Sequence, residues 1–525
     1  MRVLITDNIS AKCIEILKKA GLEVDVMTDL KPEDLKKRIG DYHGLIIRSA
    51  TKVSSDIIRA ARNLKVIARA GSGLDNVDRI AATKKGIVVM NTPGGNTITT
   101  AEHTIALMVS LARLVPQATL SMKKGKWDKK KFMGVELFNK TLGIIGIGNI
   151  GSQVAKRMQG FDMNVIAYDP FLSEDRAKAM GVEKVSLEEL LGRSDFITIH
   201  TPLTSETKNL INRETIRLMK PGVRIINCAR GGIINEKDLY DALLDGRIAG
   251  AALDVFEKEP PEDNPLIRLE NVICTPHLGA STKEAQENVA TAVAEQVVDY
   301  LVFNTIRNAV NFPSIPADQV ARLQPYINLA EKLGGFAAQI FEGAVTQMTI
   351  EYQGDAAEIN TAPVTIAIIK GFLTPILEET VNFVNAPIIA KERGIEVKEI
   401  KSTDSGDYQS LVGLRLKARD RMTYFAGTLF SKRDPRIVMI DTFKVEIVPE
   451  GELLFMYNND RPGVIGNIGA LLGKNNINIA RMHFGRETPG GTAISVVSID
   501  APASPELIDE IKRLPNIISV KRISI

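Results

Sequence analysis

The stretch TLGIIGIGNIG, residues 141–151, decides the fold. An apolar run leads into three glycines, Gly146, Gly148 and Gly151, and an amphipathic helical pattern follows them. In a strand–turn–helix unit of this kind, the first glycine allows the tight turn and the second lets the backbone approach a pyrophosphate. The third lets the helix pack on its strand, and the helix N-terminus faces the phosphates. The stretch therefore predicts a dinucleotide-binding turn.

A carboxylate follows at the distance that this turn requires. Asp169 ends the next apolar run, VIAYDP, about 20 residues after the glycines. A carboxylate at this place binds both ribose hydroxyls and repels a 2′-phosphate, which favours NAD over NADP. The alternative is a glycine turn in an α/β domain that binds no nucleotide.

Strands alternate with helical patterns on both sides of this unit. One series covers the first hundred or so residues, and a second runs from the glycine turn to NVICTPHLGAST at 271–282. Such alternation predicts parallel sheets with crossover helices. A long helical pattern, KEAQENVATAVAEQVVDYLV, then returns the chain. We expect an α/β fold in which a nucleotide domain, residues 98–282, is inserted into an outer domain made of residues 1–97 and 283–312.

Two further units follow a proline-containing linker at residues 308–316. Residues 313–450 have a mixed α+β pattern, with a hairpin at 411–430 that carries Arg415, Lys417 and Arg419 on one strand face. That basic face is either solvent-exposed or an anion site. Residues 451–525 read as βαββαβ, which is the ferredoxin-like order.

Composition excludes several classes of protein. The 525 residues carry a net charge of only +3, so no strong electrostatic footprint points to nucleic acid as a partner. No apolar run is long enough for a membrane span, and MRVLITDNIS lacks the core of a signal peptide. Cys13, Cys228 and Cys274 are far apart and lack metal-ligand spacing, so neither a disulfide framework nor a metal site is expected. We expect a reduced, cytoplasmic protein.

Oxidation of an alcohol with NAD needs a base, a partner for that base and a cation. His277, in TPHLGAST, suits the base because the pKa of histidine lies near working pH. Glu259 can stabilise its charged form, and Arg230 offers a planar fork for a carboxylate. All three follow predicted strands, so they can converge at one sheet edge. The alternatives are that Arg230 is a turn residue and that Glu259 is merely solvated.

The other histidines are weaker candidates. His43 and His103 are interpreted as structural, and His483 belongs to the C-terminal unit. His200 ends the strand FITIH at the edge where ligands bind in open α/β sheets, so it either touches substrate or is structural.

Five motifs resemble those of the D-isomer-specific 2-hydroxyacid dehydrogenases: GIIGIGNIG, YDP, NCARGGIINE, ALDVFEKEP and PHLGAST. IIRSAT, IARAGSGLDNVD and NTPGGNTITTAEH resemble the motifs of members that oxidise 3-phosphoglycerate, and DRPGVIGNIGALLGKNNINI resembles an ACT domain, a small amino-acid sensor. The resemblance covers essentially the whole chain. It implies a Rossmann-like NAD domain inserted in a flavodoxin-like substrate domain, then an α+β intervening domain holding an anion effector, then a ferredoxin-like ACT domain.

The resemblance also implies the site residues. Arg230, Glu259 and His277 would be catalytic. Besides the glycine turn, the cofactor contacts would be Ser72, Asn149, Ile150, Asp169, Thr201, Cys228, Ala229, Arg230, Asp254, His277, Gly279 and Ala280. The substrate contacts would be Arg48, Ser49, Arg69, Gly71 and Asn96. Lys129 and Lys130 would reach the substrate phosphate from a neighbouring subunit.

The same resemblance implies regulation and assembly. Asn458, Asp460 and Asn478 match the positions at which the ACT domain would bind L-serine, since an acid and amides suit the groups of a free amino acid. ACT domains pair, so a homo-oligomer, a tetramer, is expected. The implied reaction is NAD-dependent oxidation of 3-phospho-D-glycerate to 3-phosphohydroxypyruvate, the first step of L-serine biosynthesis.

Overall fold

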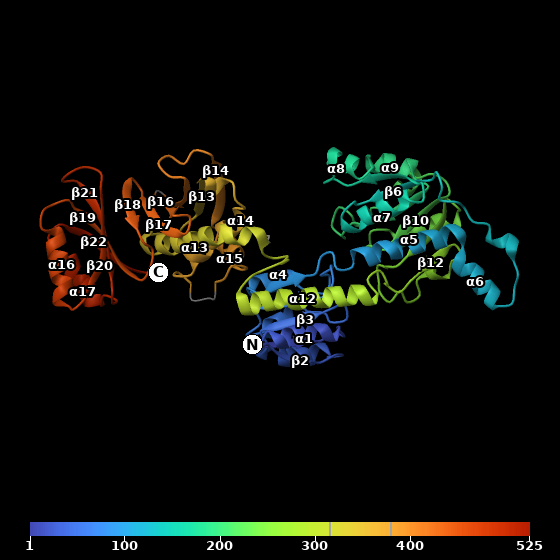
Figure 1. Ribbon diagram of the computed structural model, residues 1–525, viewed down its shortest axis with the longest axis horizontal. Coiled ribbons are helices and arrows are strands. Elements are labelled where there is room, and N and C mark those ends of the chain that lie inside the picture. The colour runs from blue at the N-terminus through green and yellow to red at the C-terminus, as the bar shows by residue number, and fades with distance from the viewer. Residues whose placement is uncertain (314–316, 378–380, 420) are drawn as a thin grey trace.

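A computed structural model describes residues 1–313, 317–377, 381–419 and 421–525. The molecule is elongated, with two lobes formed by the N-terminal part of the chain and a pair of lobes formed by the C-terminal part (Figure 1). The lobe that contains the N-terminus lies between the other lobe of the N-terminal part and the pair of C-terminal lobes (Figure 1). Residues 314–316 of the expected linker lie outside the described ranges.

The first sheet has five parallel strands in the order β2-β1-β3-β4-β5, the flavodoxin-like order expected. Helix α12 (Lys283–Phe303) returns to this sheet, packs beside α1 and buries Val293 and Val297 in the core. The other elements are β1 (Arg2–Ile5), α1 (Ala11–Lys19), β2 (Glu23–Val26), α2 (Pro32–Arg38), β3 (Gly44–Ile47), α3 (Ser55–Ala60), β4 (Val66–Arg69), α4 (Arg79–Lys84) and β5 (Val88–Asn91).

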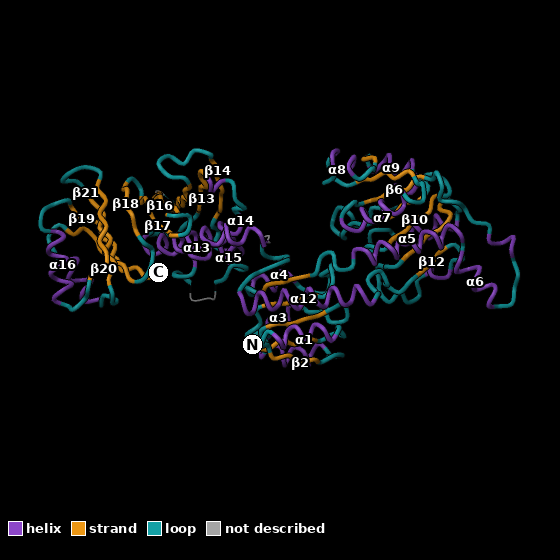
Figure 2. Tube along the Cα trace, in the orientation of Figure 1, coloured by secondary structure: helices purple, strands orange, loops and turns teal. Residues whose placement is uncertain are grey.

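The second sheet has seven parallel strands in the order β12-β11-β10-β9-β6-β7-β8, a Rossmann-like arrangement with β6 and β9 at its centre. Helices cover both faces (Figure 2). The elements are α5 (Thr97–Arg113), β6 (Thr141–Ile145), α7 (Asn149–Gln159), β7 (Asn164–Tyr168), α8 (Glu174–Ala179), β8 (Glu183–Lys184), α9 (Leu187–Arg193), β9 (Phe196–Ile199), α10 (Arg213–Leu218), β10 (Val223–Asn227), α11 (Glu236–Leu244), β11 (Ile248–Leu253) and β12 (Val272–Cys274).

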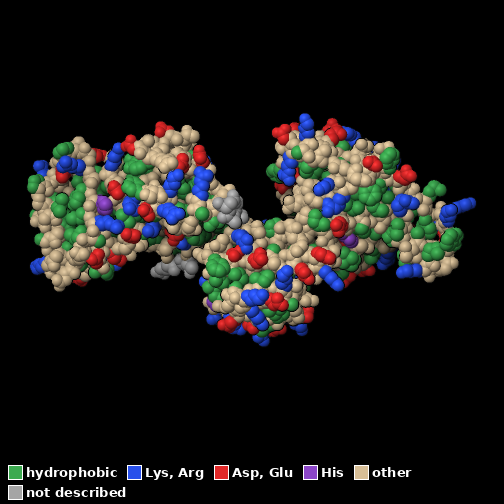
Figure 3. Space-filling model, viewed as in Figure 1, with side chains coloured by type: hydrophobic (Ala, Val, Ile, Leu, Met, Phe, Trp, Pro, Cys, Tyr) green, Lys and Arg blue, Asp and Glu red, His purple; other side chains and the backbone are tan. Residues whose placement is uncertain are grey.

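A protruding arm, residues 115–135, leaves this lobe after α5 (Figure 1). Its helix α6 (Val115–Lys123) buries none of its residues, and a 3-10 turn follows at Lys129–Phe132. Hydrophobic and basic side chains gather at the arm (Figure 3). Within the described ranges, no unbroken helix has the length and apolar character of a membrane span; α5 and α6 meet that test only jointly, across a 65° bend.

The third sheet has six strands in the order β14-β13-β15-β16-β17-β18. Strands β15 and β16 form the expected hairpin, and Arg415 and Lys417 face away from the core that buries Leu414 and Leu416. The elements are α13 (Ala317–Ile340), β13 (Gln347–Gly354), α14 (Ala362–Leu373), α15 (Ala386–Glu392), β14 (Glu396–Ser402), β15 (Ser410–Ala418), β16 (Arg421–Phe430), β17 (Asp434–Ile440) and β18 (Phe443–Ile447).

The last sheet is antiparallel, in the ferredoxin-like order β20-β21-β19-β22, as the pattern predicts. Its elements are β19 (Glu452–Asn459), α16 (Val464–Lys474), β20 (Ile479–Arg486), β21 (Thr492–Ile499), α17 (Pro505–Lys512) and β22 (Ile517–Ser524). Helices α16 and α17 pack on one face of this sheet. The other face packs on the preceding unit, where the Phe336 and Phe455 rings meet edge to face at 6.3 Å. The two C-terminal units therefore share one continuous core.

A docking segment, residues 382–385, joins this C-terminal body to the first lobe. Val384 is 4% exposed and lies in the core of the first sheet. Asn382 Nδ2 donates to the Gly86 carbonyl at 2.8 Å, and the Phe383 ring meets Phe312 edge to face at 6.2 Å. The C-terminal body thus contacts the first lobe through packed side chains as well as through the covalent linker.

Candidate active site

The glycine turn has the geometry that the sequence predicts. Gly146 follows β6 with φ of +88°, and a Cβ there would lie 2.6 Å from Thr201 Cγ2. A Cβ on Gly151 would overlap the Gly146 carbonyl, whereas Gly148 faces open space. The turn is therefore closed where α7 packs on β6 and open at Gly148, just before α7, which leaves room for a pyrophosphate.

Asp169 lies at the end of β7, beside this turn. Its Oδ2 accepts the N–H of Ile147 at 3.0 Å and its Oδ1 accepts the N–H of Phe171 at 2.9 Å. These bonds fix the carboxylate at the edge of the glycine turn, which suits a ribose and supports the fit of NAD to this chain.

A cavity of about 820 Å³ lies between the first and second sheets. Both lobes line it, and it contains most of the residues expected to bind substrate or cofactor. These are Arg48, Ser49, Arg69, Gly71, Ser72, Asn96, Ile150, Thr201, Cys228, Ala229, Arg230, Asp254, Glu259, His277, Gly279 and Ala280. The other five lie beside the cavity, in the glycine turn, in the first turn of α7 and directly after β7: Gly146, Gly148, Asn149, Gly151 and Asp169.

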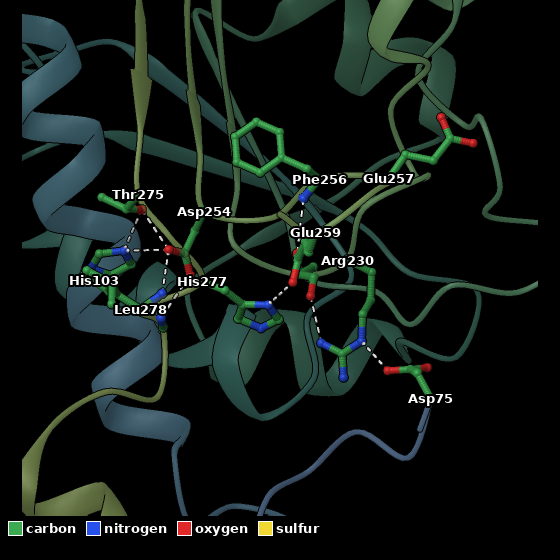
Figure 4. Close-up of polar contacts among 12 residues, drawn as sticks. Asp75, His103, Arg230, Asp254, Phe256, Glu257, Glu259, Thr275, His277 and Leu278 are labelled. Atoms are coloured by element: carbon green, nitrogen blue, oxygen red, sulfur yellow. Dashed lines mark hydrogen bonds and ion pairs between the residues drawn. The ribbon is translucent and has the colours of Figure 1, made fainter. Parts of the chain in front are cut away.

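His277 and Glu259 form a pair at this cavity (Figure 4). His277 Nδ1 lies 2.8 Å from Glu259 Oε2, and Glu259 Oε1 accepts the Phe256 N–H at 3.1 Å. The bond to Glu259 raises the pKa of His277 against the opposing effect of burial. Burial acts to raise the pKa of Glu259, but the bond and charge of His277 outweigh it and the pKa lies below its ordinary value. The pair therefore favours imidazolium beside carboxylate.

Asp254 organises the loop that carries His277. Its Oδ1 accepts the N–H of Leu278 at 2.7 Å and the hydroxyl of Thr275 at 2.6 Å, and its Oδ2 accepts the N–H of Gly279 at 2.8 Å. His103 Nε2 lies 3.2 Å from the same Oδ1 (Figure 4). Burial acts to raise the pKa of Asp254, but these hydrogen bonds outweigh it and lower the pKa. The interpretation of His103 as simple packing missed this hydrogen-bond partner.

Arg230 follows β10 and faces the first lobe. Asn227 shapes its loop, because Asn227 Nδ2 donates to the Arg230 carbonyl at 2.9 Å and Asn227 Oδ1 accepts the Ala229 N–H at 3.0 Å. The Arg230 guanidinium lies close to Arg69 of the other lobe. Burial lowers the pKa of Arg69, and the charge of Arg230 adds to the effect. Two arginines, one from each sheet, therefore converge at the cavity.

Sequence reasoning did not identify Asp75, which pairs with Arg230 from the first lobe. Asp75 Oδ2 accepts Arg230 Nε at 3.1 Å (Figure 4). The signal was present in IARAGSGLDNVD, but nothing in the sequence shows that it faces Arg230, 155 positions away.

His200 lines the cavity from the end of β9. Its Nε2 lies 3.0 Å from Thr198 Oγ1, and no described residue bonds its buried Nδ1. Burial lowers its pKa to about 4, so the ring is neutral at ordinary pH. Thr201 Oγ1 is likewise buried without a partner among the described residues. Two unsatisfied polar atoms beside the glycine turn suit a polar ligand at this place.

Lys129 and Lys130 lie on the protruding arm and do not line the cavity. The resemblance assigned them to the site of a neighbouring subunit, and within one chain they do not meet the other expected substrate contacts.

The three expected serine contacts do not meet within one chain. Asn458 pairs with Ala493, and Asp460 follows it on the same strand end. Asn478 precedes β20, whose first residue pairs with Ile499, and Ile499 pairs with Glu452 at the far end of β19. At about 3.4 Å per residue, Asn478 lies on the order of 20 Å from Asn458. Asp460 also accepts Arg486 Nη1 at 2.9 Å.

The fold and this cavity define a class of protein: the D-isomer specific 2-hydroxyacid dehydrogenases, which bind NAD. Residues 105–279 match the NAD binding domain of that class. Residues 322–441 match the D-3-phosphoglycerate dehydrogenase intervening domain, and residues 453–516 match the ACT domain. The chain belongs to the D-3-phosphoglycerate dehydrogenase family, as its relatives show.

Those relatives match over nearly their whole length. The chain is 47% identical to D-3-phosphoglycerate dehydrogenase of Archaeoglobus fulgidus, over 99% of each chain. It is 46% identical to the enzyme of the same name from Methanocaldococcus jannaschii, over 100% of each chain. Among solved structures, D-lactate dehydrogenase from Aquifex aeolicus in complex with NAD and lactic acid is 30% identical, with a TM-score of 0.54. That match covers 59% of this chain and 100% of the other.

Proposed function

We propose that this protein oxidises 3-phospho-D-glycerate to 3-phosphohydroxypyruvate with NAD, the first step of L-serine biosynthesis. The observation that carries the proposal is the His277–Glu259 pair, which faces the same cavity as Arg230. The cavity also contains Arg48 and Arg69, and a substrate with a carboxylate and a phosphate needs several cations.

In this mechanism Arg230 holds the substrate carboxylate and polarises the oxygen that becomes the carbonyl. His277 Nε2 takes the hydroxyl proton, because Nδ1 is engaged by Glu259. Glu259 then stabilises the imidazolium, as the raised pKa of His277 indicates. NAD, when bound, supplies the hydride acceptor. Closure of the two lobes would exclude water from the cavity.

The cofactor would lie along the edge of the second sheet. The glycine turn and the N-terminus of α7 would hold the pyrophosphate, and Asp169 the adenine ribose. The hydroxyl of Thr201, which has no hydrogen-bond partner among the described residues, is available to a ligand. On the first-lobe side of the cavity, Ser72 Oγ donates to Asn96 Oδ1 at 2.8 Å, and this bond orders the loop that would contact the nicotinamide. The other cofactor residues named from the resemblance would also contact the cofactor.

The proposal assigns one task to each part of the chain. Residues 1–97 and 283–312 would bind substrate, with Arg48, Ser49, Arg69, Gly71 and Asn96 as contacts. Residues 98–282 would bind NAD. Residues 313–450 would be the intervening domain and hold an anion effector, and residues 451–525 would be the regulatory ACT domain.

A homotetramer is part of the proposal. The arm exposes large apolar side chains that one chain leaves uncovered, including Trp127 at 79% and Met133 at 84%. A second copy seated on the arm would cover them and would bring Lys129 and Lys130 towards a neighbouring cavity. Pairing of two ACT domains would likewise unite Asn478 of one copy with Asn458 and Asp460 of the other, forming a serine site.

The proposal places the enzyme in the cytoplasm. Its three cysteines, Cys13, Cys228 and Cys274, are free thiols. A reducing compartment keeps thiols in this state.

The test is NADH formation by the purified protein with 3-phosphoglycerate, with and without L-serine. We expect turnover that serine suppresses, and loss of about 10²–10⁴-fold in kcat for His277→Ala. Turnover of glyoxylate or hydroxypyruvate in its place would transfer the assignment to a sibling enzyme. NAD binding without turnover of any 2-hydroxy acid would indicate a regulator that only senses NAD.

A further inference from the structure

Asp75 is the carboxylate that holds Arg230 from across the cavity. It lies on the loop that follows β4 in the first lobe, whereas Arg230 follows β10 in the second. Asp75 Oδ2 accepts a hydrogen bond from Arg230 Nε at 3.1 Å, and the Asp75 side chain lines the cavity and is 75% exposed to solvent. The proposed mechanism assigns Asp75 no task, although it touches the cation that would grip the substrate.

The hydrogen bonds of Arg230 leave one edge of its guanidinium available. Nε donates to Asp75, and Nη1 donates to the Ala229 carbonyl at 2.6 Å. Among the described residues, no bond occupies Nη2. Nη1 has a second N–H besides the one bonded to Ala229, so the Nη1–Nη2 edge can still offer a substrate carboxylate two parallel N–H groups. Asp75 thus selects which edge of the fork faces the cavity.

Gly73 packs against the same fork. A Cβ on Gly73 would overlap Arg230 Nη2 and would lie 3.1 Å from both Arg69 Nη1 and Asp75 Oδ2. Arg69 Nη1 donates to the Gly73 carbonyl. The loop therefore fixes two arginines by its backbone and side chains together, and Asp75 supplies a negative charge beside them.

We infer that Asp75 is a positioning residue. It orients Arg230 to bind the substrate carboxylate, and its bond to Arg230 connects the first lobe to the reaction site. This inference rests on the proposed function, in which Arg230 grips the substrate. Asp75 acts through Arg230 and is not itself in contact with the reacting atoms. A guanidinium displaced by about 1 Å is expected to cost on the order of 10²-fold in kcat/KM.

The experiment is a double-mutant cycle. We expect Asp75→Ala to lower kcat/KM for 3-phosphoglycerate by about 10²-fold. Asp75→Asn, whose amide oxygen still accepts Nε, should restore about tenfold of that loss. In an Arg230→Gln background, Asp75→Ala should have no further effect, because the residue it positions is absent. Asp263→Asn, which removes an exposed carboxylate outside the cavity, is the control for the change of charge.

A binding measurement makes the test independent of turnover. Oxalate, whose adjoining carboxylates imitate a 2-oxo acid, is titrated into the complex with NADH. We expect Asp75→Ala to weaken oxalate binding at least tenfold and to leave NADH affinity unchanged. Gly73→Ala should weaken oxalate similarly, because its methyl group displaces the fork.

The outcomes separate the two proposals. The wild type could fail to turn over 3-phosphoglycerate while Asp75→Ala still weakens oxalate binding. That result would refute the substrate assignment and support the positioning role. Wild-type kinetics and oxalate affinity in Asp75→Ala overturn the positioning role. Additive losses in kcat/KM when Asp75→Ala is combined with Arg230→Gln would also overturn the positioning role. Failure of the wild type to bind oxalate would overturn it as well.

Discussion

The docking segment makes a quantitative prediction about the contact between the C-terminal body and the first lobe. Val384 is 4% exposed and belongs to the core that also contains Val88 and Leu301. Asn382 holds the segment in shape, because its Oδ1 accepts the N–H groups of Val384 and Asn385 at 2.9 and 3.1 Å. The perturbation is Val384→Ala, which removes packing and keeps these backbone bonds.

The expected cost follows from the burial. Val384→Ala deletes two buried methyl groups, each worth about 0.8 kcal/mol, and leaves a small cavity. The sum is about 2 kcal/mol, which raises the population of the undocked state about 30-fold. Catalysis without serine should change less than about twofold, because residues 382–385 do not line the cavity. Inhibition by serine should weaken, since the contact that would transmit it is open more often.

The assay is hydrogen exchange of the peptide 381–392, read beside serine inhibition of turnover. Exchange should accelerate about 30-fold where protection depends on docking. Val302→Ala is the matched control, because Val302 is 45% exposed on α12 and loses the same two methyl groups. Equal exchange in the two variants would refute the reasoning, as it would show that Val384 does not hold the contact.

Three further predictions concern the site and the assembly. Because Glu259 raises the pKa of His277, the imidazole is protonated and unable to act as a base below that raised pKa; Glu259→Gln should move the acid limb of the kcat/KM–pH profile for oxidation to lower pH and reduce kcat. Asp169→Ser should raise the KM for NAD about 10–100-fold, by loss of charge-assisted hydrogen bonds, and narrow the preference over NADP, as rates with both cofactors will show. Trp127→Asp should shift the oligomer towards smaller species in sedimentation velocity, since it places a charge on an apolar arm; an unchanged mass would exclude the arm from the interface.

Local patterns were sufficient for the nucleotide turn. Gly146, Gly148, Gly151 and Asp169 belong to one strand–turn–helix–strand unit, and each has a conformational or chemical requirement that the residue type reveals. A Cβ would collide at Gly146 and Gly151 and would meet open space at Gly148, as the spacing predicts. The convergence of Arg230, Glu259 and His277 followed from a general property of parallel sheets, whose strand ends meet at one edge.

Contacts between separate units could not be derived in this way. Asp75 and Arg230 belong to different sheets, and their ion pair depends on how two lobes face each other. Asn478 lies at the opposite end of its sheet from Asn458, which follows from strand register and not from composition. Sequence proximity and residue type carry no information about either arrangement, so the chain needed a structure to reveal them.

In the fourth sheet, the sequence pattern predicts that both faces are covered but does not identify the unit that covers the second face. Strand β19 has a continuous apolar run, Leu453 to Met456, and all of these side chains are buried. A continuous run indicates a strand covered on both faces, yet its helices, α16 and α17, cover only one. The six-stranded unit covers the other, through Phe336 against Phe455. Because that interface is a hydrophobic core and not a hinge, an effector that moves the last sheet would move the whole C-terminal body, and Val384 with it. The docking segment is therefore the place where such a movement would reach the first lobe.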